Sequence, residues 1–279
     1  MIRYIKALLF LVWFGTSHLL AGAQQNLFDY GHTLRFARHL SASGQHRFAA
    51  DEYERLFFKN PADTTVALEM ARNYRLGNMC EQSAWLFGEL LKKDDTVLSG
   101  NFNREYLRYA LHCGVPADDY FRHTSALPVE EAVFYNLSYY WATQNYNEAI
   151  RYNREQRALL EQEYPEIYHM GVMYDLEKRK SPAIAALMSA VIPGSGKAYS
   201  ERWGDAVISL LFVGSNAWAS YRAFNKKGVK SVNGWIFGTL AFSFYSSNIW
   251  GSAQAAKSYN SEVNQRYQRN AEAIIHLSY

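Results

Sequence analysis

Apolar positions follow a helical period through the first half of this chain. From about residue 27 to residue 164 they recur every three or four residues, with no strand-like alternation and no Asn-Gly hairpin turn. The pattern also repeats itself after 34 positions, which predicts a series of similar helix pairs. The matching residues of two successive copies are Ala37, Leu40, Ala49, Tyr53 and Pro61 in the first and Ala71, Tyr74, Ser83, Phe87 and Asp95 in the second.

Each residue type in the repeat has a packing role. Small side chains such as Ala37 and Ala49 let two helix backbones approach closely, and the aromatic side chains of Tyr53 and Phe87 fill the space between neighbouring helix pairs. Pro61 ends a helix because it has no N–H to donate to the preceding turn. We therefore expect these positions to be buried between helices.

A period of 34 residues is typical of tetratricopeptide repeats, in which antiparallel helix pairs stack on one another. Residues 44–53 and residues 145–150 resemble the turn and second helix of such a repeat. Between them lies a degenerate copy, with a helix over 103–112, a stop at Gly114 and a short second helix opened by Pro116. The resemblance covers about half of the chain, and the usual Trp and Gly of the first helix are missing. Another kind of all-helical solenoid is the alternative.

The resemblance implies binding rather than catalysis, since the concave face of such repeats commonly holds peptides or partner helices. Side chains of the first helix in each pair that point away from the neighbouring helices are expected to line this groove. The candidates for contact with a protein partner are Arg35, Arg72 and Asn73.

Hydropathy changes abruptly at Ser181. A connecting helix is expected over residues 165–180, and beyond it charged residues become scarce. Three apolar stretches without a charged residue follow, at residues 183–192, 206–221 and 231–256. Residues 181–256 are therefore predicted to form a separate membrane module.

The lengths of the three stretches decide their expected relation to a bilayer, which a helix of about 20 apolar residues crosses. The third stretch is long enough, the second just reaches if Arg222 extends to the surface, and the first is expected to be re-entrant or interfacial. Their small residues favour close helix packing in lipid, and tryptophans lie near the expected ends. These are Trp203, Trp218, Trp235 and Trp250. The alternative is an apolar helical hairpin outside the membrane, packed beneath the repeats.

The turn that follows the first stretch carries a second resemblance. Its sequence Pro-Gly-Ser-Gly-Lys-Ala-Tyr, at residues 193–199, and the following Trp-Gly-Asp-Ala, at 203–206, resemble a small bacterial membrane module with a Pro-Gly-x-Gly-x-x-Tyr turn. Such modules often follow tetratricopeptide repeats in exported proteins of Gram-negative bacteria. The resemblance covers about a quarter of the chain and implies architecture, not activity. Glu201 departs from the pattern, since Gly is common there.

This turn is the second candidate site. Its residues are Pro193, Gly194, Gly196, Lys197, Tyr199 and Arg202. A glycine-rich turn exposes backbone N–H groups, and two cations beside it suit an anion. We therefore expect the turn at the membrane surface, with Lys197 and Arg202 placed to hold a lipid phosphate.

Two independent features predict the orientation of the chain. Residues 1–23 read as a secretory signal peptide, with an uncleaved amino-terminal anchor as the alternative. The loop between the second and third stretches carries Lys226, Lys227 and Lys230, and such loops favour the cytoplasmic side. Together they predict a bacterial inner-membrane protein with its repeats, residues 24–164, in the periplasm and a polar helical tail over 257–279 on the same side.

Composition adds limits rather than a function. The formal net charge of +3 is too small to indicate nucleic-acid binding, and no basic block stands out. The two cysteines, Cys80 and Cys113, can form a disulfide after export, or stay as two thiols within helices.

No catalytic or cofactor motif is recognisable. The turn at residues 194–197 is not a nucleotide-binding phosphate loop, because Val191 and Ala198 stand where that motif needs Gly and Ser or Thr. The eight histidines show no metal-ligand spacing, and the paired carboxylates read as solvated helix starts. The expectation is a protein that is not an enzyme and binds no cofactor or nucleotide.

The sequence as a whole predicts an all-α protein, a tetratricopeptide-like helical solenoid followed by an α-helical membrane hairpin. Its expected function is that of a membrane-anchored scaffold in the bacterial envelope, with a protein partner on the repeats and membrane lipid around the hairpin. The alternative is an accessory in transport or membrane insertion that acts through the glycine-rich turn and the hairpin.

Overall fold

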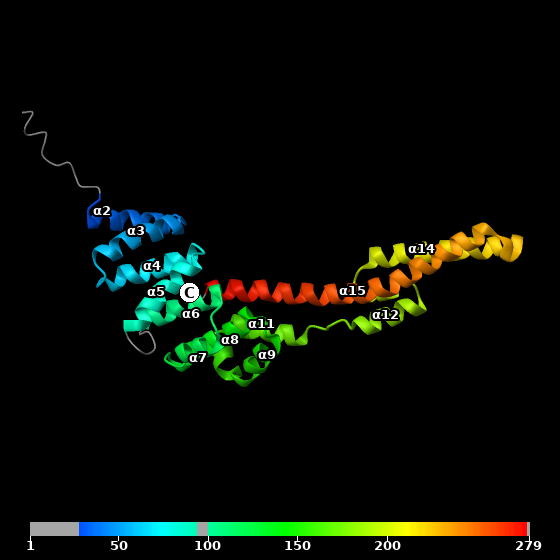
Figure 1. Cartoon of the computed structure of the whole chain (residues 1–279). Helices are drawn as coiled ribbons and strands as arrows, with labels where there is room; N and C mark the ends of the chain where they lie inside the picture. Colours follow the sequence, from blue (N-terminus) through cyan, green and yellow to red (C-terminus); the bar gives the residue numbers. More distant parts are fainter. Residues whose placement is uncertain (1–27, 94–99, 278–279) are drawn as a thin grey trace, which may run out of the picture. The chain divides into compact units, whose positions relative to one another are not determined.

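The computed structural model describes residues 28–93 and 100–277 (Figure 1). The expected signal peptide, residues 1–23, and the repeat position Asp95 lie outside these residues. Every regular element within them is helical, with no strand, which confirms the predicted all-α class. The chain forms two compact units that divide after Pro128, and each is taken by itself below. This division falls inside the segment 24–164 that was assigned to the repeats.

The described part of the first unit consists of six helices, labelled as in Figure 1. They are α2 (Tyr30–Ala42), α3 (His46–Lys59), α4 (Thr64–Leu76), α5 (Cys80–Lys93), α6 (Gly100–Cys113) and α7 (Ala117–Thr124). The bounds of α4 and α5 recur 34 residues after those of α2 and α3, so the helix pairs keep the period of the sequence. Aspartates at the same spacing cap the pairs, since Asp29 and Asp63 accept hydrogen bonds from backbone N–H groups in the first turns of α2 and α4.

The residues that the repeat predicts to pack are buried. Ala37 and Ala71 are 0% exposed, and Tyr53 and Phe87 are 1% exposed. They lie where α2 packs on α3, α3 on α4, and α4 on α5 and α6. These packing positions are therefore confirmed, whereas the assignment to tetratricopeptide repeats stays a prediction.

Buried polar contacts tie the degenerate copy to the rest of the first unit. Glu105 on α6 faces Arg75 on α4, with the Arg75 Nε atom 2.6 Å from the Glu105 Oε1 atom and both side chains buried. Asn103 on α6 donates to the backbone carbonyl of His123 on α7 at 2.9 Å. Burial, with the nearby Arg122 cation, lowers the pKa of His123 below its usual value. Polar contacts between helices thus hold α6 against α4 and α7, in the region where the sequence repeat is degenerate.

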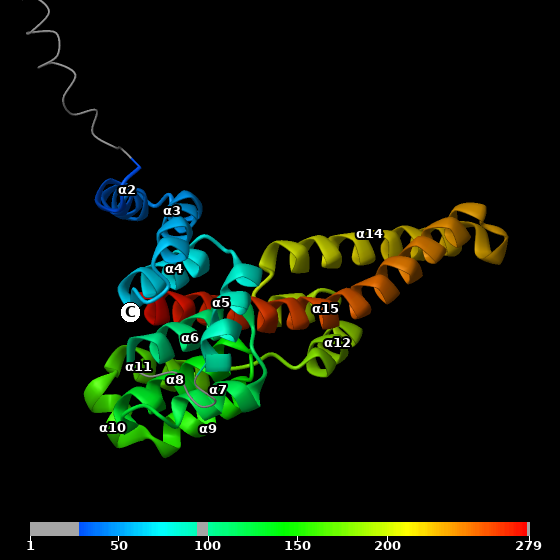
Figure 2. The same ribbon diagram turned by 60° about the vertical axis from the view of Figure 1, so that its left-hand side comes forward.

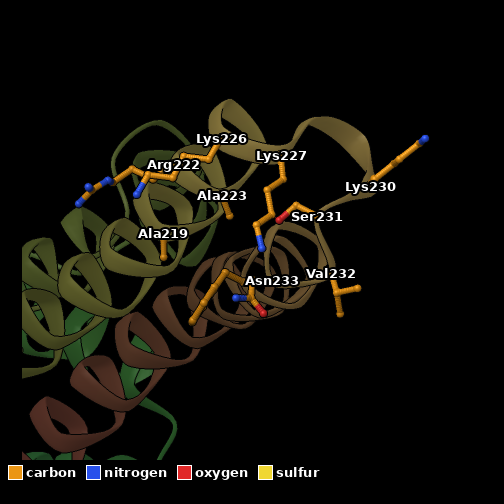
Figure 3. A pocket seen from close by; sticks show the side chains of 10 residues that line it. Ala219, Arg222, Ala223, Lys226, Lys227, Lys230, Ser231, Val232 and Asn233 are labelled. Carbon is orange, nitrogen blue, oxygen red and sulfur yellow. The ribbon is translucent and has the colours of Figure 1, made fainter.

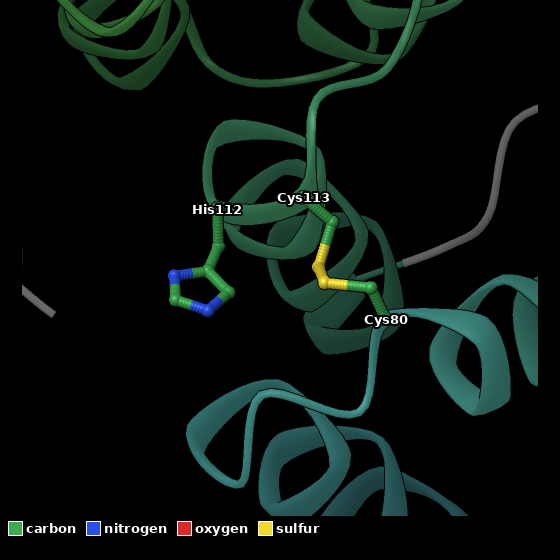
Figure 4. Close-up of side chains that lie close together, drawn as sticks. All are labelled: Cys80, His112 and Cys113. Carbon is green, nitrogen blue, oxygen red and sulfur yellow. A yellow bond between two sulfur atoms is a disulfide. The ribbon is translucent and has the colours of Figure 1, made fainter.

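A disulfide closes the second helix pair onto α6. Cys80 at the start of α5 is bonded to Cys113 at the end of α6, with Cα atoms 5.7 Å apart and a sequence separation of 33 (Figure 4). Of the two states left open by the sequence, the structure contains the bonded one. The bond holds together two helix ends that the sequence leaves independent.

The second unit begins with four short helices and continues into the module predicted for the membrane. Its helices are α8 (Val129–Ala142), α9 (Tyr146–Glu155), α10 (Arg157–Glu163), α11 (Pro165–Leu176), α12 (Pro182–Val191), α13 (Ser195–Tyr199), α14 (Trp203–Lys227) and α15 (Val232–Leu277), with a 3₁₀ turn at Gly228–Lys230 before α15. Figure 2 shows α14 running beside the first half of α15, and α12 beside its middle.

Three helix pairs share one turn geometry. Gly44, Asn78 and Gln144 follow α2, α4 and α8, and all three have positive φ, at 76°, 62° and 58°. In each turn the next residue donates its N–H to a carbonyl five positions back, as Gln45 does to Leu40. Asparagine and glutamine adopt this left-handed conformation less readily than glycine does. The same geometry occurs at Glu201 between α13 and α14, so it is a common helix ending and does not by itself mark a repeat.

The long carboxyl-terminal helix differs from the expected domain division. A hairpin ending at residue 256 and a separate tail over 257–279 were predicted, but α15 is continuous from Val232 to Leu277 because no proline or turn interrupts it. Its later turns pack on α8 and α11, with Val263, Tyr267 and Ala271 buried at a spacing of four residues. The tail thus forms part of the second unit's core.

No helix within residues 28–93 and 100–277 is both long enough and apolar enough to cross a membrane. The helices α14 and α15 cover the two predicted spans, and the membrane hairpin stays a prediction. Serine and asparagine within both stretches, among them Asn216, Ser220, Asn233 and Asn248, lower their hydropathy.

Candidate functional site

The glycine turn, residues 193–196, follows α12, includes the start of α13, and packs against α12 and α14. Gly194 has φ of +91°, and a Cβ atom there would overlap the carbonyl oxygen of Ala206 on α14. A Cβ atom on Gly196 would overlap the carbonyl oxygen of Ala185 on α12. Real Cβ atoms essentially never come within 3.0 Å of such a neighbour, and both of these Cβ–oxygen distances would be well below that limit. The two glycines are therefore explained by close backbone packing.

The backbone N–H groups of the turn bind neighbouring side chains. Gly194 donates to the Oδ1 atom of Asn248 on α15 at 3.1 Å, and Gly196 donates to the Oγ atom of Ser189 on α12 at 2.9 Å. The Ser189 hydroxyl also lies 2.6 Å from the hydroxyl of Ser252 on α15. This buried network joins α12, the turn and α15, and it uses the N–H groups that an anion would need.

The charged residues of the turn also have partners within the chain. The ammonium of Lys197 donates to the Ser209 hydroxyl on α14 at 2.8 Å, and Arg202 pairs with Asp205 at 2.7 Å. The Tyr199 hydroxyl accepts from the backbone N–H of Ser181 at 3.2 Å. Pro193 follows Ile192, the C-cap of α12, and is half-buried. The contacts assign these residues to packing, and the lipid-phosphate role of Lys197 and Arg202 stays a prediction.

Sequence reasoning missed the partners of the turn. Asn248 and Ser252 lie one helical turn apart in a stretch without charged residues and are 3% and 0% exposed. A polar pair at this spacing marks one face of a helix, and this signal was available in the sequence. Which residues they would meet was not, because Ser189 is 59 and 63 positions away, respectively.

The helices α14 and α15 have an inverted polarity. Small and polar residues make close contacts between them: the Ser220 hydroxyl donates to the carbonyl of Gly234 at 2.8 Å, and a Cβ atom on Gly238 would lie 3.0 Å from the Ser220 Oγ atom. Two aromatic pairs also join the helices, Phe212 with Phe244 and Phe224 with Trp235. Many of the large apolar residues are nevertheless exposed. On α14 and α15 these include Val207, Ile208, Leu211, Phe212, Trp218, Val232, Trp235, Ile236, Phe242 and Trp250.

The same outward apolar surface continues on α12, where Leu187 is 69% and Val191 is 77% exposed. Helices that face water bury their large apolar residues and expose polar ones. Helices that pack in lipid do the opposite, with small residues between them and large ones outside. We call the exposed apolar residues of α12, α14 and α15 the apolar face.

The predicted groove residues divide between surface and interior. Arg35 on α2 and Arg72 on α4 are exposed, as expected for contact residues. Asn73 is 0% exposed, and its Oδ1 atom lies 3.0 Å from the Nδ1 atom of His46 on α3. Asn73 therefore joins α3 to α4 and offers no surface to a partner, because the helix turns its side chain toward the neighbouring pair.

A small cavity on α3–α5 was not predicted. Its volume is about 290 Å³, and its lining includes Phe58, Tyr74 and Trp85 together with the carboxylates of Glu54 and Glu81. Phe58 and Trp85 are 63% and 45% exposed. Burial raises the pKa of Tyr74 well above its usual range, so its hydroxyl stays neutral. An acidic cavity with aromatic walls suits a basic or aromatic side chain.

One group of potential metal ligands occurs in the part of the chain that the structure describes. It contains Cys80, His112 and Cys113, whose ligand atoms lie within 4.8 Å of one another (Figure 4). The two sulfur atoms are joined in the disulfide, and the His112 Nε2 atom lies 2.6 Å from the Asn78 Oδ1 atom. Since metal binding needs free thiolates, this group has a structural role in the bonded state.

Comparison of the chain with protein-family models, with curated proteins and with solved structures finds no match.

Proposed function

We propose that this protein is a non-enzymatic scaffold of the bacterial envelope that attaches to a membrane through the apolar face and holds a protein partner on its amino-terminal helices. The observation that carries the proposal is the inverted polarity of α14 and α15. Small residues and the Ser220–Gly234 hydrogen bond lie within their contact, beside two aromatic pairs, whereas many leucine, isoleucine, phenylalanine and tryptophan side chains are exposed.

Energetics supports lipid as the surroundings of the apolar face. A large apolar side chain contributes roughly 1.5 to 3 kcal/mol when it is moved fully out of water. Ten side chains of α14 and α15 that are each about half exposed would together contribute on the order of 10 kcal/mol. No Asp, Glu, Lys or Arg lies within residues 206–221 or 231–256, so attachment there needs no buried charge.

Aromatic residues support the same surroundings. Trp203 and Trp250 are each 68% exposed, and Trp218 and Trp235 are 62% and 61% exposed. Tryptophan is enriched where a protein meets the boundary between lipid and water. We therefore propose that the apolar face is in contact with lipid.

Two features of the first unit support the proposed compartment and the proposed protein partner. The Cys80–Cys113 disulfide is the kind of bond that persists in oxidising compartments outside the cytosol. The cavity beside Phe58 and Trp85 offers exposed aromatic residues, which are enriched where proteins bind one another. We retain tetratricopeptide-like stacking as the proposal for how the helix pairs present this surface.

Vesicle flotation tests the membrane attachment. The full chain is expected to float with neutral phosphatidylcholine vesicles, and the variant Leu210→Asp/Leu211→Asp is expected to stay at the bottom of the gradient. The matched control is Phe36→Asp/Phe48→Asp, which places the same charges at comparably exposed apolar sites of the first unit. Equal flotation of both variants, or no flotation of the unmodified chain, would count against the proposal.

Site-specific crosslinking tests the partner site. A photo-reactive residue in place of Trp85 should give one discrete crosslinked protein in cells, and one in place of Phe48, which is exposed but outside the cavity, should not. The same crosslinked protein from both positions, or none from either, would contradict a partner site at this cavity.

A further inference from the structure

The connection between α14 and α15 gathers cations around a cavity. The cavity has a volume of about 410 Å³, and Figure 3 shows the side chains that line it. Its basic residues are Arg222, Lys226, Lys227 and Lys230, all exposed. We call these four residues the basic tip.

No acidic residue balances the basic tip within this part of the chain. The sequence contains neither Asp nor Glu from residue 206 to residue 261. The glycine turn differs in this respect, since Arg202 pairs with Asp205 and Lys197 binds Ser209 there. The basic tip therefore has the positive charge that an anion requires.

The cavity also supplies polar groups and an apolar wall. Ser231 and Asn233 line it beside the cations, and in Figure 3 the Lys227 side chain extends toward Asn233. The remaining lining residues, Ala219, Ala223, Val232 and Phe237, are apolar. A phosphate that is covalently attached to an apolar chain can bind the cations while its chain covers the apolar wall. A free phosphate would leave the apolar wall in water.

Exposed apolar residues surround the cavity. Val229 is 78% exposed, and Val232 is 71% exposed. Trp235 is 61% exposed and donates its indole N–H to the carbonyl of Val229 at 2.9 Å, which fixes the ring beside the basic tip. Cations next to exposed tryptophan and valine are typical of the depth at which lipid head groups lie.

We propose that the basic tip binds the phosphate head group of an anionic phospholipid, with Asn233 as a further polar contact. This inference rests on the proposed membrane attachment and adds the lipid class to it. The apolar face would attach to lipid of any charge, and the basic tip would select for anionic lipid.

Binding of the full chain to vesicles tests the inference. The probes are vesicles of phosphatidylcholine alone and vesicles that also contain phosphatidylglycerol. Each basic residue near an anionic surface contributes about a factor of five in affinity, so Lys226→Gln/Lys227→Gln/Lys230→Gln should weaken binding to the anionic vesicles by about 100-fold. Binding of this variant to neutral vesicles should not change. The control Lys178→Gln/Lys257→Gln/Arg269→Gln removes three exposed positive charges elsewhere in the second unit and should retain most of the preference.

The outcomes separate the two proposals. If the unmodified chain binds neither kind of vesicle, the membrane attachment fails and the inference fails with it. If it binds both kinds equally, or if the tip variant keeps the full preference, the inference is overturned and the attachment stands. If inorganic phosphate displaces the chain from anionic vesicles more than chloride does at equal ionic strength, the cavity is a site for free phosphate, and the lipid assignment is wrong.

Discussion

Replacement of Gly196 by alanine should destabilise the module that carries the apolar face. The added Cβ atom would overlap the carbonyl oxygen of Ala185 and would lie 2.8 Å from the Oγ atom of Ser189. Relief of this overlap requires the turn to move away from α12. Overpacking in a close-packed interior costs about 1 to 3 kcal/mol.

The movement would also break hydrogen bonds. Gly196 donates to Ser189, whose hydroxyl is shared with Ser252 on α15. Each buried hydrogen bond contributes about 1 kcal/mol, and a buried donor left without an acceptor costs more. The expected loss in the free energy of unfolding is therefore about 3 to 5 kcal/mol.

Thermal unfolding in detergent micelles, followed by circular dichroism, measures this effect. A loss of this size should lower the unfolding temperature by roughly 10 °C for a chain of this length. The matched control is Gly214→Ala on α14, where a Cβ atom meets nothing within 4 Å. That change should be neutral or stabilise by about 0.5 to 1 kcal/mol, because alanine favours the helix. Equal unfolding temperatures for the two variants would show that the turn is not closely packed.

Three further predictions concern the first unit. Cys80→Ser/Cys113→Ser should lower its free energy of unfolding by about 3 to 4 kcal/mol, because the disulfide closes a loop across a separation of 33 residues. Urea unfolding measures this loss, and an unchanged midpoint would contradict it. In the same assay Glu105→Gln should lower the free energy of unfolding by about 3 to 5 kcal/mol, because the Arg75 cation stays buried without a carboxylate. The control Glu89→Gln, at the exposed pair with Lys92, should lower it by less than about 1 kcal/mol. Burial lowers the pKa of His123 in the folded unit, so the unfolded state takes up the proton first as pH falls below about 6.5, and stability should fall from there toward the folded pKa. His123→Gln should flatten this part of the pH profile, and an unchanged profile would show that another group titrates.

Local patterns in the sequence predict much of the first unit. The spacing of 34 residues places Ala37 and Ala71, and Tyr53 and Phe87, at equivalent buried positions, and the structure confirms this. The aspartate that caps each pair follows the same spacing and was readable as well. These features are local because a helix sets which of its own residues share a face.

Pairings between distant residues could not be read from the sequence. The bonds from Ser189 to Ser252 and from Gly194 to Asn248 join positions 63 and 54 residues apart, and no local period specifies them. Asn73 shows the same limit, since its spacing suited an outward position and its bond to His46 turned it inward. The continuity of α15 was missed because the charge that begins at Lys257 changes composition without ending a helix.

The candidate sites could be predicted from the sequence only in part. The glycine turn was recognised from its spacing, but its role in packing depends on Ala185 and Ala206, which the sequence does not place beside it. The basic tip was read only as a signal of orientation. Its cavity arises because α14 and α15 meet there, so that residues of both helices line it.

Quenching of tryptophan fluorescence by brominated phospholipids tests most directly whether the apolar face contacts lipid. The full chain in vesicles with brominated acyl chains should lose much of the emission of Trp203, Trp218, Trp235 and Trp250, which are all exposed on the second unit. In a background that also carries Trp13→Phe and Trp85→Phe, replacement of these four residues by phenylalanine leaves only Trp141, which is 0% exposed, and should abolish most of the quenching. Emission of the unmodified chain that brominated lipid leaves unchanged would contradict the account.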